Sequence, residues 1–226
     1  MYLDALEDAI CIFASYPTTN SLPSFEREMP NRLVVAAALI DNDSVVELAQ
    51  QTLTKLGIAH GDVVLLTQSG RKTVALAHLN ESDDAKPGVA HISTIMRRNL
   101  HVDIGDEVSL SGLGGDVSYG RHIRVLPIDD TLDDNISRDK LFENYLQPHF
   151  AGAYRPVHQG DLLLVPSDVM GGPDVEFVVV ATDPKPYCIV GPDTDIIYDG
   201  APVSRVDNQP DAFHAIFHRT IGIRPS

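Results

Sequence analysis

Two adjacent carboxylates, Asp129 and Asp130, stand near the end of the segment YGRHIRVLPIDDT (residues 119–131). A carboxylate pair can serve as general acid and base, but that chemistry needs a second convergent group and a cause for a shifted pKa. The sequence shows neither beside this pair. We therefore interpret the aspartates as a solvated turn, and the run before them as the last strand of a first β unit, whose exit is set by Pro127.

The remaining chemically suggestive residues do not form a recognisable catalytic or metal motif. Lys72 lacks the preceding glycine of a phosphate-binding loop, because Arg71 stands there. Cys188 lies inside an apolar run and is expected to be a packed core residue. His214 and His218 have helical spacing but no third ligand nearby, and apolar neighbours favour a small apolar face. The sequence thus predicts no catalytic residue, no metal and no bound cofactor or nucleotide.

The charge of the chain restricts its partners. Thirty-two acidic residues against 17 basic ones give a formal net charge of −15. Nucleic acids and anionic membranes attract Lys and Arg, so both are unfavourable partners, whereas basic or zwitterionic proteins fit. Two unclustered cysteines, acids in place of a basic signal sequence, and no apolar run of about 20 residues predict a cytoplasmic protein, with the nucleus as the alternative.

A repeated pattern predicts the architecture of the first half. LGIAHGDVVLL (residues 56–66) and LHVDIGDEVSL (residues 100–110) align at a constant offset of 44 residues, and VHQGDLLLV (residues 157–165) is a third Gly-Asp copy. Glycine allows a positive φ, and aspartate can accept from nearby backbone N–H groups where the strand begins. Short helices are expected within residues 44–57 and 88–99. A duplicated strand–helix–strand unit closed into a barrel follows from this pattern.

The second half combines one amphipathic helix with several strands. Leu141, Phe142, Tyr145 and Leu146 share one side of the helix. Strands are expected within residues 161–166, 175–184, 187–194 and 196–200. The fold class is mainly β with short helices (α+β). The predicted organisation is an extension (1–30), a first β unit (31–118), a connecting strand and linker (119–131), a second β unit (132–207) and a tail (208–226).

Several long segments resemble one family. NRLVVAAALIDNDSVVELAQ, RRNLHVDIGDEVSL, LFENYLQPHFAGAYRPVHQGDLLLV and TDPKPYCIVGPDT, in this order, are similar to the N-terminal domain of the valosin-containing protein or CDC48-type AAA ATPases, over about residues 31–207. The resemblance implies a double-psi β-barrel followed by a smaller β-barrel, with no catalytic centre. It also implies binding of UBX domains or short linear motifs in ubiquitin-dependent degradation, including that of endoplasmic-reticulum clients.

The resemblance leaves the biological setting open. No Walker motif follows residue 207 in this sequence. The chain is therefore expected to be either a stand-alone relative of the N domain or a part of a full-length ATPase. A ubiquitin-binding cofactor subunit of the Ufd type is a further alternative, because such cofactors use a similar two-barrel domain.

The family binds adaptors in a groove between its two barrels, which the resemblance carries over to twelve positions. These are Asp43, Val45, Ala59, His60, Asp62, Ala77, Leu79, Ser118, Tyr119, Ala151, Tyr154 and Arg155.

Some positions depart from what the family usually has. Ala59, Ala77 and Ala151 replace larger apolar residues, and His60 replaces an arginine. Each lost large side chain removes apolar burial worth about 1.5–3 kcal/mol, which predicts a wider pocket or a weaker fit for the usual Phe-Pro loop. His101, Asp103 and Pro166 stand where the family has arginines facing its ATPase ring, so ordinary docking on a ring is not expected.

Overall fold

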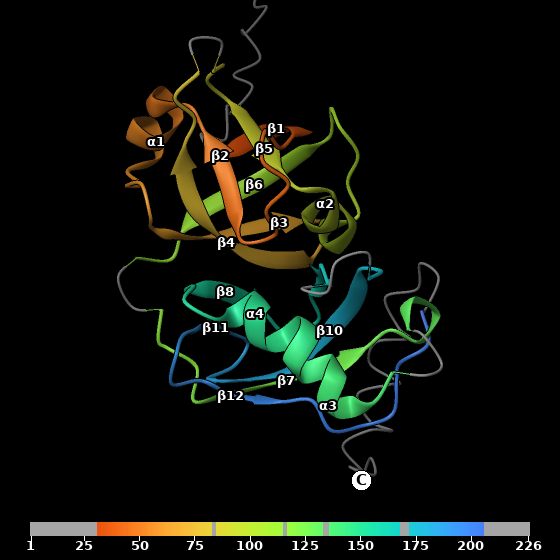
Figure 1. Cartoon of the computed structure of the whole chain (residues 1–226). Coiled ribbons are helices and arrows are strands. Elements are labelled where there is room, and N and C mark those ends of the chain that lie inside the picture. Colours follow the sequence, from red (N-terminus) through yellow and green to blue (C-terminus); the bar gives the residue numbers. More distant parts are fainter. Residues whose placement is uncertain (1–30, 83–84, 115–116, 133–135, 168–171, 206–226) are drawn as a thin grey trace, which may run out of the picture.

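The computed structural model describes residues 31–82, 85–114, 117–132, 136–167 and 172–205. The predicted extension (1–30) and tail (208–226), with His214 and His218, lie outside the described residues. Figure 1 shows two β units stacked on each other, the first coloured orange to green and the second green to blue. Among the described helices, none is both long and apolar enough to cross a membrane.

The first unit is a closed barrel with strand order β1-β5-β2-β4-β3-β6. The strands are β1 (Arg32–Ala37), β2 (Val45–Leu48), β3 (Val63–Gln68), β4 (Arg71–Leu79), β5 (Val89–Ile92) and β6 (Glu107–Gly112). β1 with β5 and β2 with β4 are parallel pairs, and the other neighbours are antiparallel. Closure pairs every edge of the sheet, which removes the template for unwanted strand addition.

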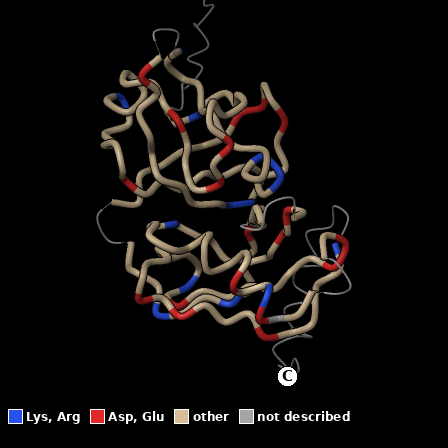
Figure 2. Tube along the Cα trace, viewed as in Figure 1, with Lys and Arg blue, Asp and Glu red and all other residues tan. Residues whose placement is uncertain are grey.

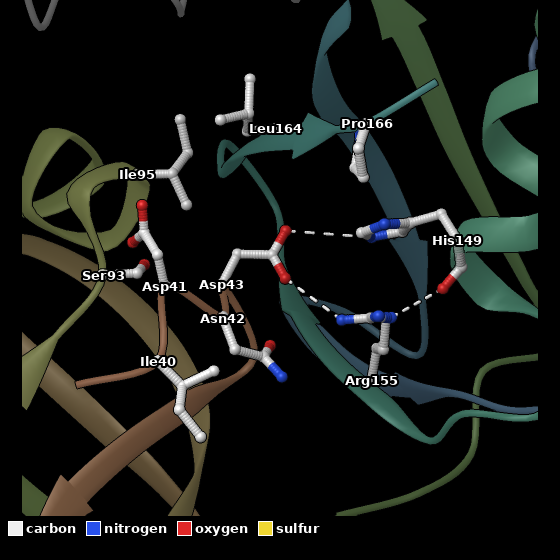
Figure 3. Close-up of a pocket in the computed structure, with 10 residues that line it drawn as sticks. All are labelled: Ile40, Asp41, Asn42, Asp43, Ser93, Ile95, His149, Arg155, Leu164 and Pro166. Atoms are coloured by element: carbon white, nitrogen blue, oxygen red, sulfur yellow. Dashed lines mark hydrogen bonds and ion pairs between the residues drawn. The ribbon is translucent and has the colours of Figure 1, made fainter. Parts of the chain in front are cut away.

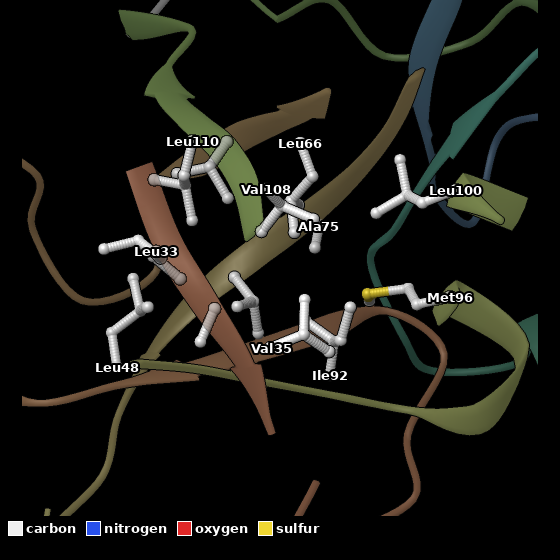
Figure 4. Packing of buried hydrophobic residues seen from close by; sticks show 14 of the residues in the cluster. Leu33, Val35, Leu48, Leu66, Ala75, Ile92, Met96, Leu100, Val108 and Leu110 are labelled. Carbon is white, nitrogen blue, oxygen red and sulfur yellow. The ribbon is translucent and has the colours of Figure 1, made fainter. Parts of the chain in front are cut away.

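Alternating burial along the strands fills the barrel. In β1, Leu33 and Val35 point into the core while Val34 between them is exposed, the period-2 pattern of a strand with one wet face. Figure 4 shows these side chains meeting Leu66, Val108 and Leu110 from other strands. Met96 and Leu100 of the second helix pack against the same core.

The duplication is confirmed, and the structure corrects its details. The helices α1 (Gln50–Leu56) and α2 (Thr94–Leu100) occupy only the later part of the two stretches in which helices were expected. The earlier parts are strands β2 and β5, because their Val and Ile side chains pack into the barrel core. β2-α1-β3 and β5-α2-β6 begin at residues 45, 50, 63 and 89, 94, 107, so each element recurs at the predicted offset.

The three Gly-Asp turns adopt the same geometry. Gly61, Gly105 and Gly160 have φ of 91°, 96° and 98°. The following aspartate in each copy, Asp62, Asp106 or Asp161, accepts a hydrogen bond from the backbone N–H three residues earlier. Strands β3, β6 and β9 begin directly after these turns, as predicted.

The second unit contains two sheets and a segmented helix. β12-β7-β10-β9 form one sheet and β11-β8 the other. The strands are β7 (His122–Pro127), β8 (Arg155–His158), β9 (Leu162–Val165), β10 (Val175–Asp183), β11 (Tyr187–Val190) and β12 (Asp195–Ile197). The helix comprises α3 (Arg138–Leu141), a π-helical turn (Phe142–Leu146) and α4 (Gln147–Phe150), and it buries Leu141, Tyr145, Leu146 and Phe150.

The segment before the aspartate pair belongs to the second unit, so the prediction that it ends the first unit is wrong. β7 pairs with β10 and β12, so it belongs to the second unit and is not the last strand of the first barrel. Its inward side chains, such as Ile123 and Val125, enter the second core. The short 3₁₀ helix η2 (Asp129–Thr131) follows, and the exposed Asp130 receives two hydrogen bonds from Arg205. The aspartates thus anchor the segment that contains Arg205.

Candidate functional site

The two β units meet along β4 and α2 of the first and β8 and β9 of the second. Asn99 of α2 exchanges two hydrogen bonds with the backbone of Leu162, at 3.0 and 2.8 Å. Arg98 donates two bonds to the carboxylate of Glu176, at 2.7 and 3.0 Å. Because these contacts are reciprocal or bidentate, they orient one unit on the other. A site formed between the units therefore has a defined geometry.

Arg155 joins both units at one end of this junction. Its Nη1 donates to Asp43 Oδ1 at 3.2 Å and to Ser44 Oγ at 3.0 Å in the first unit. Its Nε donates to the backbone carbonyl of His149 at 2.7 Å in the second. Figure 3 shows Asp43 facing both the Arg155 guanidinium and the His149 ring.

Burial decides the charges in this cluster. Burial raises the pKa of the Asp43 carboxyl, and the Arg155 guanidinium opposes part of that rise. Burial, together with the charge of Arg155, lowers the pKa of His149 to about 3. The His149 ring is therefore neutral at physiological pH, and its Nε2, 3.8 Å from Asp43 Oδ2, is not part of an ion pair.

Two exposed tyrosines form an aromatic surface next to Arg155. Tyr119 and Tyr154 are 62% and 55% exposed, and their ring centroids are 5.7 Å apart. Both rings lie over Gly191, at which a Cβ atom would come within 3.4 Å of each. Tyr119 forms a parallel bridge with Ile189, so strand pairing positions its ring. Large exposed aromatic side chains are typical anchors of protein interfaces.

A second group of predicted residues surrounds the end of β4. The backbone N–H of Ala77 donates to the carbonyl of Asp62 at 2.8 Å, and that of Leu79 donates to His60 Nδ1 at 3.2 Å. The His60 ring meets His78 edge-on, with ring centroids 4.6 Å apart. These bonds hold the loop before β3 against β4.

The structure thus places nine of the twelve predicted residues in two groups. Asp43, Tyr119, Tyr154 and Arg155 are at the junction, and Ala59, His60, Asp62, Ala77 and Leu79 are at the end of β4. Ser44 connects the groups, because it bonds Arg155 and its carbonyl accepts from Leu76 of β4. Val45 begins β2, and Ser118 and Ala151 are exposed. The Ala77 side chain is 1% exposed in the barrel core, so it offers no surface to a ligand.

Two functional-site residues were missed from the sequence. His149 and Gly191 belong to the junction, yet neither stands in a motif. The signal in the sequence is their position: His149 lies in the last turn of a helix shortly before Tyr154 and Arg155, and Gly191 follows a strand. The pairing of β8 with β11 brings Gly191 close to Arg155, and the bond from Arg155 Nε to the His149 carbonyl holds His149 there.

The chemistry of the described residues suits binding. Within the described ranges no three His, Cys, Asp or Glu side chains gather in a way that could hold a metal ion. Burial raises the pKa of the Cys188 thiol to about 11, which disfavours the reactive thiolate. The three positions that lack the expected arginines, His101, Asp103 and Pro166, are all exposed.

Comparison with known families agrees with this architecture. Residues 32–113 match the family model of the N-terminal domain of cell division protein 48 (CDC48). Residues 139–205 match the model of CDC48 domain 2. The first match covers the closed barrel and the second covers β8 to β12 with the preceding helix. Since the two matches follow in this order and together span most of the described chain, the protein belongs to the CDC48 N-terminal domain family of AAA ATPases.

Proposed function

We propose that this chain is an adaptor-docking module, which binds a UBX-like domain or a short linear motif of a partner protein at the junction of its two units. The observation that carries this proposal is the exposed pair Tyr119 and Tyr154, supported by strand pairing and flanked by Arg155. Interface energy concentrates in aromatic and arginine side chains of this kind. The family membership of the chain supports the same role.

The shape of the surface predicts which partner fits. Ala59 and Ala151 are small and exposed, so they leave room for bulky side chains of a partner at these two positions. His60 uses Nδ1 to accept from the Leu79 backbone, so only Nε2 is left to meet a partner, where a guanidinium would present a fork of donors. We therefore expect a partner with a large apolar or aromatic side chain and little dependence on a carboxylate opposite His60.

The cellular role follows by the same inference. We place this docking module in ubiquitin-dependent protein degradation, including that of endoplasmic-reticulum clients, in the cytoplasm or nucleus. The adaptor recruited at the junction would connect a ubiquitinated client to a CDC48-type ATPase. A ubiquitin-binding cofactor of the Ufd type is distinguished from this role by direct binding of ubiquitin itself.

The test is a calorimetric and NMR titration of the protein with an isolated UBX domain. Tyr119→Ala and Tyr154→Ala should each weaken binding about tenfold or more, since loss of an aromatic anchor removes contacts at the centre of the interface. Tyr187→Ala, at the far end of the β8–β11 pair, is the matched control and should bind like the unaltered protein. Unchanged affinity in both tyrosine variants, or NMR shifts on adding ubiquitin but none on adding the UBX domain, would contradict adaptor docking at this surface.

A further inference from the structure

Large exposed apolar side chains also gather on a surface formed by the first unit alone. Val34, Leu39 and Ile104 are 42%, 62% and 63% exposed. Val34 lies within β1, and Leu39 follows the same strand. Ile104 precedes Gly105, whose N–H donates to the Val35 carbonyl of β1 at 2.9 Å. Val34, Leu39 and Ile104 therefore lie in one region of the barrel exterior, which we call the β1 surface.

The backbone that carries the β1 surface is held by hydrogen bonds. The N–H of Val34 donates to the Gly88 carbonyl at 2.9 Å. The N–H of Leu39 donates to the carboxylate of Glu47 at 2.9 Å, and Glu47 is buried in β2. The apolar side chains are thus exposed from an ordered backbone. Neighbouring exposed apolar side chains of this kind are typical of an interaction site.

Carboxylates border the β1 surface. Asp103, Asp106 and Glu107 lie between α2 and β6 and at the start of β6, where Figure 2 shows acidic positions, and all three are exposed. Arg32 of β1 pairs with Glu107 at 3.2 Å. Residues 101–107 contain neither Lys nor Arg. The border therefore has a net negative charge.

This charge distinguishes between the possible occupants. A second copy of the chain would bring its own carboxylates against these, and like charges brought together across an interface oppose binding. Anionic lipid is repelled for the same reason. A protein segment with apolar residues between Lys or Arg residues fits both features, because its apolar side chains cover the β1 surface while its cations meet the carboxylates.

We propose that the β1 surface docks a basic segment of a partner protein, in which apolar anchors are flanked by Lys or Arg. Apolar burial supplies the affinity, and the carboxylates select the partner and speed its association. The surface includes neither Tyr119 nor Tyr154. This docking is therefore separate from the binding of an adaptor at the junction and does not depend on it.

The experiment is an NMR titration of the full chain with the synthetic peptide Lys-Lys-Leu-Ile-Leu-Lys-Lys, blocked at both ends. We expect saturable shifts at residues 32–39 and 103–107. Ile104→Ser should weaken binding about fivefold or more, because it removes an apolar contact from an exposed position. Asp103→Asn should weaken binding about threefold and make the affinity less sensitive to salt.

Matched peptides and variants separate local docking from attraction to the net charge. A peptide with glutamate for each lysine, or with serine for each apolar residue, should not bind. Asp195→Asn removes the same charge from an exposed position of the second unit and should bind like the unaltered protein, as should Tyr119→Ala.

Three outcomes would overturn the proposal. The serine peptide could bind as well as the leucine peptide, which would show attraction to net charge alone. Ile104→Ser could leave the affinity unchanged. Shifts at residues 32–39 could depend on protein concentration without any peptide, which would identify a second copy of the chain as the occupant.

Discussion

At the scale of single residues, the two copies of the duplicated unit have different residues at the C-terminal cap of their helix. Gly57 and His101 both end a helix in the left-handed region, with φ of 66° and 54°. Their N–H groups point to the helix carbonyls that would otherwise lack partners. Glycine adopts this conformation without strain, whereas a side chain with a Cβ atom costs about 1–2 kcal/mol there. The second copy therefore carries strain that the first does not.

His101→Gly should stabilise the protein by about 1 kcal/mol, because it removes this strain at an exposed position. The measurement is the free energy of unfolding from urea denaturation followed by circular dichroism. Gly57→Ala is the reciprocal control, since no atom lies within 4 Å of an added Cβ and the effect is confined to the backbone. It should destabilise by a similar amount. Stabilisation by both substitutions would rule out this explanation.

At the scale of elements, the third Gly-Asp turn has a use that the other two lack. Asp161 is buried between the units, where its Oδ2 accepts from Thr73 Oγ1 of β4 at 2.8 Å and from the N–H of His158. Burial raises the pKa of Asp161 to about 8, against the opposing effect of these bonds. The equivalent residues Asp62 and Asp106 are exposed. The third Gly-Asp turn thus also connects the second unit to β4 of the first.

Asp161→Asn should remove a pH dependence of stability. The folded protein retains the Asp161 proton up to about pH 8, whereas the unfolded chain releases it near the usual value of 3.8. The contribution of Asp161 to the free energy of unfolding is therefore complete below about pH 4. It is lost as pH rises to about 8, by up to about 1 kcal/mol per pH unit. Urea denaturation at several pH values should show that the free energy of unfolding falls less between about pH 4 and 8 in the variant than in the unaltered protein. Asp106→Asn, whose carboxyl faces water, should leave the decline unchanged.

The sequence predicts where strands begin better than it predicts which strands pair with each other. The repeat at 44 residues and the Gly-Asp turns are local, so β3, β6 and β9 are placed correctly. The sequence does not reveal β2 and β5 as strands, because a short apolar run fits either a helix or a strand. Hydrogen bonding to neighbouring strands decides between the two. The sequence does not reveal the unit to which β7 belongs, because the residues of β10 and β12 that pair with it are 50 or more positions away. His149 was missed for the same reason.

At the scale of the whole molecule, polar contacts connect two units whose apolar cores are separate. Each unit has its own apolar core, and the described core clusters do not merge across the junction. Between them lie the bonds of Asn99, Arg98 and Arg155. Ion pairs with buried carboxylates contribute little net stability when intact, but removing one partner leaves an uncompensated charge. The relative orientation of the units therefore depends on Arg98, Asn99 and Arg155.

Arg155→Met should destabilise the protein by about 3 kcal/mol, because Asp43, with a side chain only 9% exposed, would lose its cation. Adding Asp43→Asn should recover most of this loss, since the stranded charge is then gone. Urea denaturation followed by NMR signals from both units measures the effect. In Arg155→Met alone, the two units should unfold at different urea concentrations. Arg32→Met, which breaks an exposed pair with Glu107, should cost less than about 1 kcal/mol. If the double variant is as unstable as Arg155→Met, the missing hydrogen bond to the His149 carbonyl, rather than the buried charge, governs the junction.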